Sequence, residues 1–388
     1  MPAYAETTFP MRALLAGARR KEHSLLDFTR KLVAAESPSE AKSAVDACVT
    51  LAAAHFKQLG GPIKLHRQPR HGNILEARFG PRRSARAAAK PILLLGHLDT
   101  VWPIGTLESM PCRVRDGRLW GPGSLDMKAG AAIAAAAIEL LMEADLLHRE
   151  IIVLLNGDEE IGSPASRPIT EALARQCAAV YVLEPAQGLA YKTARKGIGD
   201  WRIQVKGLAA HAGVDFEKGA NALLELARAI ETVSRWTDLK RGLTVNVGVA
   251  AGGTKSNVVP ANAQADIDVR IPRLADAARI ARKFVSLRPA DPRCTLTVTG
   301  GINRPPMERS RGGVRLFRKA QALAHELGFE LQEASTGGGS DGNFTAALGI
   351  PTLDGMGAVG EGAHARHESV FVEHLAPRTA LLAGMLAN

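Results

Sequence analysis

The stretch Pro91–Pro103, PILLLGHLDTVWP, decides how the rest of the chain can be organised. Its first five residues form a continuous apolar run that ends at Gly96, which is typical of a buried central strand. His97 and Asp99 follow at the carboxyl end of that strand. Side chains two apart in an extended segment point the same way, so Asp99 stands where a carboxylate would orient a metal-ligating imidazole. A capped strand end with a turn-forming Asp is the alternative, and this pattern alone does not decide between them.

Strands and helices alternate through the first half of the chain. Apolar runs at Glu150–Leu155 and Ala179–Leu183 predict two further buried strands. A helix of small residues is expected from Ala131 to Ala144, between the Pro91 strand and the Glu150 strand. This alternation predicts a doubly wound α/β sheet, in which ligands sit beyond the carboxyl ends of the strands. Further expected elements are helices over residues 11–35, 40–59 and 168–177 and an N-capping turn at Ser37–Glu40.

The pattern changes between residues 190 and 304. Strands and helices there follow the order β-α-β-β-α-β, which resembles a ferredoxin-like α+β fold, and its last strand is expected at Cys294–Val298. The α/β pattern returns after Arg304. We therefore expect a catalytic domain in two parts, residues 1–189 and 305–388, interrupted by a smaller lid domain at residues 190–304.

Composition describes an ordinary globular protein of 388 residues with 46% hydrophobic and 23% charged residues. The net charge of +10 is scattered, and aromatic residues make up only 4% of the chain. A nucleic-acid site interleaves basic and aromatic residues, so we expect no nucleic-acid partner. The positive charge would instead steer an anionic small substrate.

The four cysteines and the first residues of the chain indicate where the protein works. The cysteines are far apart and fit neither a disulfide framework nor a CxxC metal site. The N-terminus has no apolar run long enough for a signal peptide or a membrane span. We therefore expect a cytoplasmic protein with no membrane partner.

Acidic side chains and imidazoles follow the predicted strands or lie in loops. Two neighbouring zinc ions need several carboxylates, at least one of them bridging, together with neutral imidazoles. Asp126 lies between glycines in a loop, whose freedom would let its carboxylate span both ions. Of the adjacent Glu159 and Glu160, one can bind metal while the other acts as a base, although a stretch such as GDEE is more often a solvated loop. The candidate ligands are His97, Asp126, Glu160, Glu184 and His364.

Eight motifs, in order along the chain, carry a family resemblance. They are GHLDTV (96–101), GPGSLDMKAG (121–130), DEEIGSPASR (158–167), LEP (183–185), GLAAHAG (207–213), NVVPANAQADIDVR (257–270), TGGGSDG (336–342) and GEGAHARHE (360–368). From about residue 25 onward the chain resembles the di-zinc aminoacylase and glutamate carboxypeptidase family of metallopeptidases. It is most similar to the bacterial members that remove C-terminal glutamate from folates.

The resemblance implies a centre with two Zn²⁺ per subunit, for which Co²⁺ or Mn²⁺ could substitute. His97, Asp126 and Glu184 would hold one ion. Asp126, Glu160 and His364 would hold the other, so that Asp126 bridges the two.

The resemblance also implies the remaining catalytic and substrate-binding roles. Asp99 would orient His97, and Glu159 would act as general base and then as general acid. A cis peptide bond is implied between Asp126 and Met127. His211 would stabilise the oxyanion, in dimeric members by reaching the active site of the partner subunit. Asn257 and Arg270 would grip the free carboxylate of the substrate. Arg304 matches a second arginine that contacts the substrate.

These expectations lead to a first hypothesis and its rivals. The first is a zinc-dependent enzyme, a homodimer through the lid domain, that releases a C-terminal amino acid, expected to be glutamate, from an N-acyl or peptidyl substrate. The second is an N-acyl amino acid deacylase of the acetylornithine type, or a hydrolase of a larger amino-acid conjugate. A metal-stabilised binding protein without turnover is the third, and the intact Glu159 argues against it.

Overall fold

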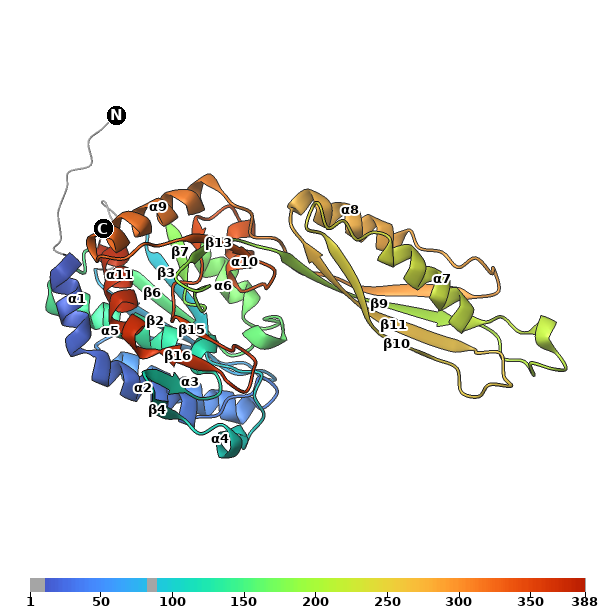
Figure 1. The fold of residues 1–388 in the computed structure, drawn as a ribbon, viewed down its shortest axis with the longest axis horizontal. Coiled ribbons are helices and arrows are strands. Elements are labelled where there is room, and N and C mark those ends of the chain that lie inside the picture. The colour runs from blue at the N-terminus through green and yellow to red at the C-terminus, as the bar shows by residue number, and fades with distance from the viewer. Residues whose placement is uncertain (1–10, 82–88, 388) are drawn as a thin grey trace. The chain divides into compact units, whose positions relative to one another are not determined.

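The computed structural model describes residues 11–81 and 89–387, which divide into two compact units (Figure 1). Unit 1 holds the described residues of Met1–Thr193, Arg309–Ser335 and Ser340–Asn388, and unit 2 consists of Ala194–Glu308 and Thr336–Gly339. The predicted insertion ran from residue 190 to residue 304, whereas the long segment of unit 2 starts at residue 194 and ends at residue 308.

A six-stranded sheet with the order β1-β2-β6-β3-β7-β14 forms the centre of unit 1. The strands β6, β3, β7 and β14 are parallel, whereas β1 and β2 form an antiparallel edge. The bounds are β1 Ile63–His66, β2 Ile74–Phe79, β3 Ile92–His97, β6 Ile151–Asn156, β7 Ala179–Val182 and β14 Thr352–Leu353.

Helices cover both faces of this sheet (Figure 1). Alternation along β3 sends Leu94 into one core and Leu93 into the other. On the Leu94 face lie α1 (Met11–Arg20), α2 (Glu22–Ala34), α3 (Lys42–Gln58), α5 (Ala129–Glu143), α9 (Arg311–Glu326) and α11 (Leu375–Ala387). On the Leu93 face lie α6 (Arg167–Ala174) and α10 (Gly342–Ala347). The predicted doubly wound α/β fold is therefore confirmed.

The small residues of α5 allow this helix to pack very close to the sheet. A Cβ atom at Gly130 would lie 2.2 Å from the carbonyl oxygen of Leu183, so only glycine fits there. The close approach places the start of α5, and the Asp126 loop before it, beside the carboxyl ends of β3 and β7.

A second, small sheet of unit 1 has the order β15-β16-β5-β4. It pairs segments that are far apart in the sequence, because β16 near the C-terminus lies against β5. The bounds are β4 Arg113–Arg115, β5 Arg118–Trp120, β15 Gly360–Glu361 and β16 Ser369–Phe371. Unit 1 also contains α4 Thr106–Ser109. The paired strands β8 Tyr191–Arg195 and β13 Glu333–Thr336 begin in unit 1 and end in unit 2.

Unit 2 is a four-stranded antiparallel sheet, ordered β10-β11-β9-β12, with two helices on one face (Figure 1). Its core contains Trp201 and Phe284, whose rings stack with centroids 4.4 Å apart. The chain order is β9 Gly197–Lys206, α7 Ala222–Ser234, β10 Thr244–Gly252, β11 Asn262–Ile271, α8 Leu274–Val285 and β12 Thr295–Arg304. This is the predicted ferredoxin-like order.

Two local predictions were wrong. The last strand of unit 2 continues to Arg304 rather than ending at Val298. The prediction stopped too early because the apolar alternation that marks a strand is lost at Gly300, although the backbone pairing with β9 goes on. Ser37–Glu40 provides no side-chain cap for α3; instead Ser37 Oγ donates to the Leu98 carbonyl at 2.6 Å, so this segment docks beside the chain that follows β3.

Across the described part of the chain, every helix is too short or too polar to cross a lipid bilayer.

Candidate metal centre

His97 is the last residue of the central strand β3. Its side chain is 1% exposed, and its Nδ1 lies 3.0 Å from the carbonyl oxygen of Asp99 and 3.4 Å from the Asp99 carboxylate. Neutral imidazole carries one proton, so a proton held on Nδ1 by these acceptors leaves the lone pair of Nε2 available. The predicted pairing of His97 with Asp99 thus leaves Nε2 free to bind a metal ion.

Asp126 lies in an irregular turn, Ser124–Lys128, that leads directly into α5. Gly123, before this turn, has a φ of 70°, in the left-handed region that favours glycine. The peptide bond between Asp126 and Met127 is cis, as the resemblance implied. The side chain of Asp126 is 15% exposed and is therefore largely buried.

Glu159 and Glu160 form a short 3-10 turn, Glu159–Ile161, after β6. The carboxylate of Asp99 accepts hydrogen bonds from both of their backbone N–H groups, each at 3.1 Å. It also accepts one from the hydroxyl of Ser39 at 2.7 Å. One buried carboxylate thus fixes the two glutamates relative to His97.

Glu184 and His364 complete the set of predicted ligands. Glu184 follows β7 at the carboxyl end of the sheet and is buried. His364 lies between β15 and β16 with a φ of 62° and a half-exposed side chain. Both approach the centre from segments that the sequence places far from β3.

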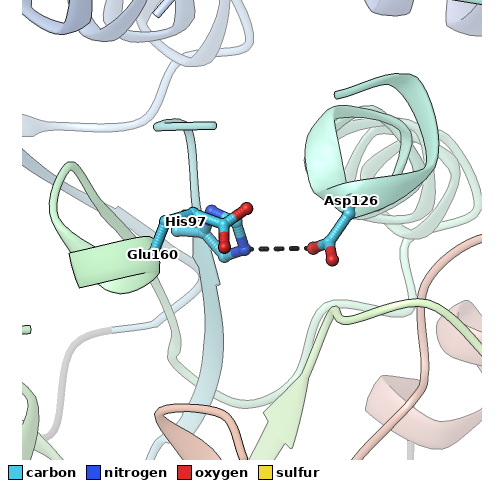
Figure 2. Close-up of side chains that lie close together, drawn as sticks. All are labelled: His97, Asp126 and Glu160. Atoms are coloured by element: carbon cyan, nitrogen blue, oxygen red, sulfur yellow. Dashed lines mark ion pairs between the residues drawn. The ribbon is translucent and has the colours of Figure 1, made fainter. Parts of the chain in front are cut away.

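The five predicted ligands come together in unit 1. His97 Nε2 lies 3.3 Å from Asp126 Oδ1 and 3.4 Å from Glu184 Oε1. His364 Nε2 lies 3.4 Å from Asp126 Oδ2 and 3.3 Å from Glu160 Oε2. Figure 2 shows His97, Asp126 and Glu160 pointing toward one another from β3, the start of α5 and the 3-10 turn. Each imidazole therefore faces two carboxylates, and Asp126 offers one oxygen to each.

These distances fit ligands of a metal ion better than hydrogen bonds. Hydrogen bonds between nitrogen and oxygen are usually about 2.7–3.2 Å long. Two atoms that each lie about 2.0–2.1 Å from a tetrahedral zinc ion are separated by about 3.4 Å. His97 Nε2 and Glu160 Oε1 are, in addition, buried without a hydrogen-bond partner among the described residues. The donor set, two imidazoles and several carboxylates, suits zinc.

The electrostatics of the centre also favour a cation. Burial disfavours the charged form of His97, yet the carboxylates of Asp126, Asp99 and Glu184 raise its pKa well above the usual value. Asp126 and Glu160 raise the pKa of His364 to about 10, against the opposing effect of burial. The carboxylates thus favour positive charge at this position, and a divalent ion would supply that charge in place of imidazole protons.

Glu159 also reaches the centre. Its carboxylate, His97 and Glu184 have ligand atoms that all lie within 4.8 Å of one another, and the same is true of His97, Asp126 and Glu160. The position of Glu159 suits the predicted base beside the metal ligands.

The remaining predicted residues belong to unit 2 and fall into two pairs. His211 and Asn257 lie side by side, since His211 bridges to Val258 and the Asn257 carbonyl accepts from the Ala212 N–H. Arg270 and Arg304 stand opposite Ile198 on its two neighbouring strands. Arg270 is paired with Asp268 at 2.8 Å, and Arg304 is buried.

The two pairs lie at opposite ends of the unit 2 sheet. Asn262 begins β11 at the end that carries Asn257, and Arg270 lies near the other end of the same strand. Eight residue steps at about 3.3 Å each separate them by about 26 Å. The structure thus brings the metal-ligand candidates together in unit 1, but within one copy of unit 2 it does not bring His211 close to Arg270.

Two buried residues at the centre were missed by the sequence analysis. Ser39, expected to belong to a helix cap, donates to Asp99. Glu368 ends the motif GEGAHARHE and accepts hydrogen bonds from the Asp126 loop. Their nearness to motif residues was the only signal, because a sequence does not show which of its carboxylates and hydroxyls become buried.

Comparisons with known proteins agree with this geometry. The profile of Peptidase family M20/M25/M40 matches residues 93–388. Carboxypeptidase G2 from Pseudomonas sp. (strain RS-16) is 30% identical over 379 residues, 96% of this chain and 91% of the relative. Succinyl-diaminopimelate desuccinylase from Stenotrophomonas maltophilia (strain R551-3) is 28% identical over 375 residues, 91% of this chain and 95% of the relative.

A solved structure supports the fold. Aminopeptidase PepT from Bacillus cereus ATCC 10987 superposes with a TM-score of 0.75 at 22% identity, covering 94% of this chain and 98% of that one. Motif order, ligand geometry and the family match over most of the chain lead to one conclusion. The chain belongs to peptidase family M20/M25/M40 and is a hydrolase that acts on amide bonds.

Proposed function

We propose that the protein is a two-zinc carboxypeptidase that releases a C-terminal glutamate from N-acyl or peptidyl substrates. The observation that carries the proposal is the pair of imidazoles, each 3.3–3.4 Å from two carboxylates, with Asp126 shared between them. His97, Asp126 and Glu184 would hold one ion, and Asp126, Glu160 and His364 the other. Similarity to a carboxypeptidase over 96% of the chain supports release from the C-terminal end.

Glu159 is the proposed proton carrier of the reaction. When bound, the ions supply a Lewis acid that polarises the amide carbonyl and lowers the pKa of water. Glu159 takes the proton of the attacking water and later gives it to the leaving amine. The hydrogen bond from its backbone N–H to Asp99 supports this role, because it holds the base in one place beside the ligands.

His211 is the proposed donor to the oxyanion. The backbone N–H of Gly213 donates to its Nδ1 at 3.1 Å, so the neutral imidazole carries its proton on Nε2. The side chain is exposed, and Nε2–H can therefore donate to a substrate oxygen. The neighbouring Asn257 offers an amide to the same substrate.

The separation of the two residue pairs supports the proposal of a homodimer through unit 2. Arg270 and Arg304 would bind the free carboxylate of the substrate, an arrangement that suits the guanidinium fork. His211 lies near the Asn262 end of β11 in the same copy, and that end is about 26 Å from Arg270 along the strand. We therefore propose that a substrate bound by the arginines of one subunit meets His211 of the partner subunit, as unit 2 closes as a lid.

The surface of unit 2 offers an apolar face for this dimer. Leu223 and Leu224 on α7 are 41% and 50% exposed, and Val249 on the edge strand β10 is 56% exposed. An edge strand with apolar neighbours is a template for pairing with a second copy.

All four cysteines are free in the structure, which supports the proposed cytoplasmic location.

A substrate panel tests the proposal. Protein reconstituted with zinc is assayed with a folate-type aroyl-glutamate, N-acetylornithine, other N-acetyl amino acids and dipeptides, each with and without chelator. We expect chelator-sensitive release of glutamate from the aroyl-glutamate. Cleavage of acetylated or succinylated amino acids alone would instead assign the enzyme to the deacylases, the class of the desuccinylase relative.

A further inference from the structure

Glu368 is a buried carboxylate beside the metal centre that has no part in the proposed reaction. It lies four residues after His364, and 1% of its surface is exposed. Both of its oxygens accept two hydrogen bonds. The four donors are the backbone N–H groups of Gly123 (2.9 Å), Leu125 (2.9 Å) and Asp126 (3.0 Å) and the indole N–H of Trp102 (2.8 Å).

This hydrogen bonding gives Glu368 a role different from that of a ligand or a base. An ionised carboxylate has about four acceptor positions, and here four N–H groups occupy them. The lone pairs of the Glu368 carboxylate are therefore occupied by hydrogen bonds within the protein and are not available to bind a metal ion or to accept a proton from water. The backbone N–H groups of Leu125 and Asp126 lie in the irregular turn and that of Gly123 lies just before it, so regular helical hydrogen bonds do not satisfy them. A buried N–H group that lost its acceptor would be destabilising. The conformation of the Asp126 loop thus depends on Glu368.

Glu368 also joins two segments that supply ligands. Its carbonyl accepts from the Gly121 N–H at 3.4 Å, and β16, which begins at the next residue, pairs with β5. The segment that carries His364 is therefore attached to the segment that carries Asp126 by its backbone and by the Glu368 side chain. The imidazole of His364 and the carboxylate of Asp126 end 3.4 Å apart.

We infer that Glu368 is a positioning residue of the metal centre, whose carboxylate sets the separation of Asp126 and His364 and thereby the affinity for the ion they share with Glu160. This inference rests on the proposed function. Groups that orient metal ligands through hydrogen bonds typically contribute about 10–100-fold to metal affinity. Replacement of Glu368 by glutamine keeps the side-chain length but turns one acceptor oxygen into an NH₂ group that faces N–H donors.

Zinc affinity of the full chain tests the inference. Metal-free wild type, Glu368→Gln and the control Glu373→Gln are titrated with zinc against a chromophoric chelator. The control removes the same charge five residues away, from a side chain that is 78% exposed. We expect Glu368→Gln to bind one of two zinc ions about 10–100-fold more weakly and the control to match the wild type. Unchanged affinity in folded Glu368→Gln would overturn the inference.

Amide exchange of the metal-free proteins provides a second readout. If Glu368 holds the loop, the amides of residues 123–126 exchange faster in Glu368→Gln and keep their wild-type rates in Glu373→Gln. A residue that only stabilises the fold would lower the melting temperature without changing either the exchange of this loop or the zinc affinity of the folded protein. That outcome would contradict the positioning role.

Trp102→Phe keeps the inference testable if Glu368→Gln does not fold. It removes one of the four donors and leaves the carboxylate in place. The expected loss of zinc affinity is about threefold to tenfold, the size of one hydrogen bond, and no loss would overturn the inference. If the wild-type chain binds no zinc, the proposed function itself is refuted. If wild type and variants bind zinc with equal affinity, only the inference about Glu368 is refuted.

Discussion

Asp99 connects three parts of the metal centre through one buried carboxylate. It lies 3.4 Å from His97 Nδ1, and it accepts hydrogen bonds from the backbone of Glu159 and of Glu160. A carboxylate that orients an imidazole also raises its strength as a ligand. Because the Asp99 carboxylate positions both the ligand His97 and the proposed base Glu159, metal binding and proton transfer both depend on it.

Replacement of Glu159 by alanine should separate these two activities. The variant lacks the carboxylate that moves the proton, so we expect its kcat to fall by about 10²–10⁴-fold. All five proposed ligands remain, so elemental analysis should still find two zinc ions per subunit. Turnover above a tenth of the wild-type rate would refute the assignment of the base, and Glu373→Gln serves as the control for loss of one carboxylate.

The pattern of strands marks the ligands that lie at or soon after strand ends. His97 ends β3, and Glu160 and Glu184 follow β6 and β7 within four residues; the carboxyl ends of parallel strands meet at one edge of a sheet. The prediction of Asp126 rested on its glycine-rich loop and that of His364 on the family resemblance. Ser39 and Glu368 could not be predicted in this way. Their role depends on which distant segments pack on them, and neither sits at a position that periodicity or spacing marks.

The helix α11 completes the helical layer on one face of the unit 1 sheet. It packs against α1, α5 and α9, and nearly all of its residues are buried. Lys319 on α9 donates to the Met385 carbonyl near the end of α11 at 3.0 Å. Burial, together with the charge of Arg149, lowers the pKa of Lys319 to about 8.

Lys319 should therefore contribute stability that grows in mildly alkaline solution. Between about pH 8 and the usual lysine pKa of about 10.4, the unfolded chain holds the Lys319 proton and the folded chain has released it. The contribution of Lys319 to the free energy of unfolding should rise over this interval by on the order of 1–2 kcal/mol. Burial raises the pKa of the Cys112, Cys177 and Cys294 thiols, which act in the opposite direction. Denaturant titrations of wild type and Lys319→Met at pH 7.5 and 9.5 therefore measure the Lys319 contribution as the difference between the two proteins.

Lys319→Met should abolish this contribution, and Lys57→Met, at an exposed position, should not. Equal pH dependence in wild type and Lys319→Met would show that the buried ammonium is not its source.

Element boundaries were predictable where hydrophobic periodicity is unbroken. The alternation of Trp201, Ile203 and Val205 marks β9 clearly. The second half of β12 carries no such pattern, because Gly300 and Gly301 have no side chains to bury and the backbone pairing with β9 alone extends the strand. Backbone pairing of this kind follows from the neighbouring strand and leaves no trace in the sequence of β12.

The two units contribute different parts of the proposed active site. Unit 1 holds the five candidate ligands and Glu159, and unit 2 carries His211, Asn257, Arg270 and Arg304. With the proposed dimer, each complete site draws on both subunits. On this proposal, activity would depend on assembly as well as on folding.

Subunit mixing tests this dependence. His211→Ala and Glu159→Ala homodimers should each be inactive, but a hybrid dimer has one site with both residues intact. After random exchange we expect about a quarter of wild-type activity, since half of the dimers are hybrids with one working site each. Absence of recovery, with exchange demonstrated by mass spectrometry, would show that each subunit is self-sufficient.

Removal of metal should destabilise unit 1 and leave unit 2 unchanged, because all the candidate ligands belong to unit 1. Free zinc at a hundredfold excess over Kd stabilises a folded site by about 2.7 kcal/mol. Calorimetry with and without chelator should show a lower melting temperature, and amide exchange should assign the loss to unit 1. Equal destabilisation of both units would contradict this assignment.

The insertion of unit 2 also sets the order in which the protein can be completed on the ribosome. Unit 2 is almost one continuous segment, Ala194–Glu308, whereas unit 1 needs α9, β14, His364 and α11, which are synthesised last. Domains generally fold as units as the chain emerges. The nascent chain can therefore finish its inserted unit while the first half of the catalytic sheet still lacks its last strand and covering helix, so the metal centre is among the last features to form.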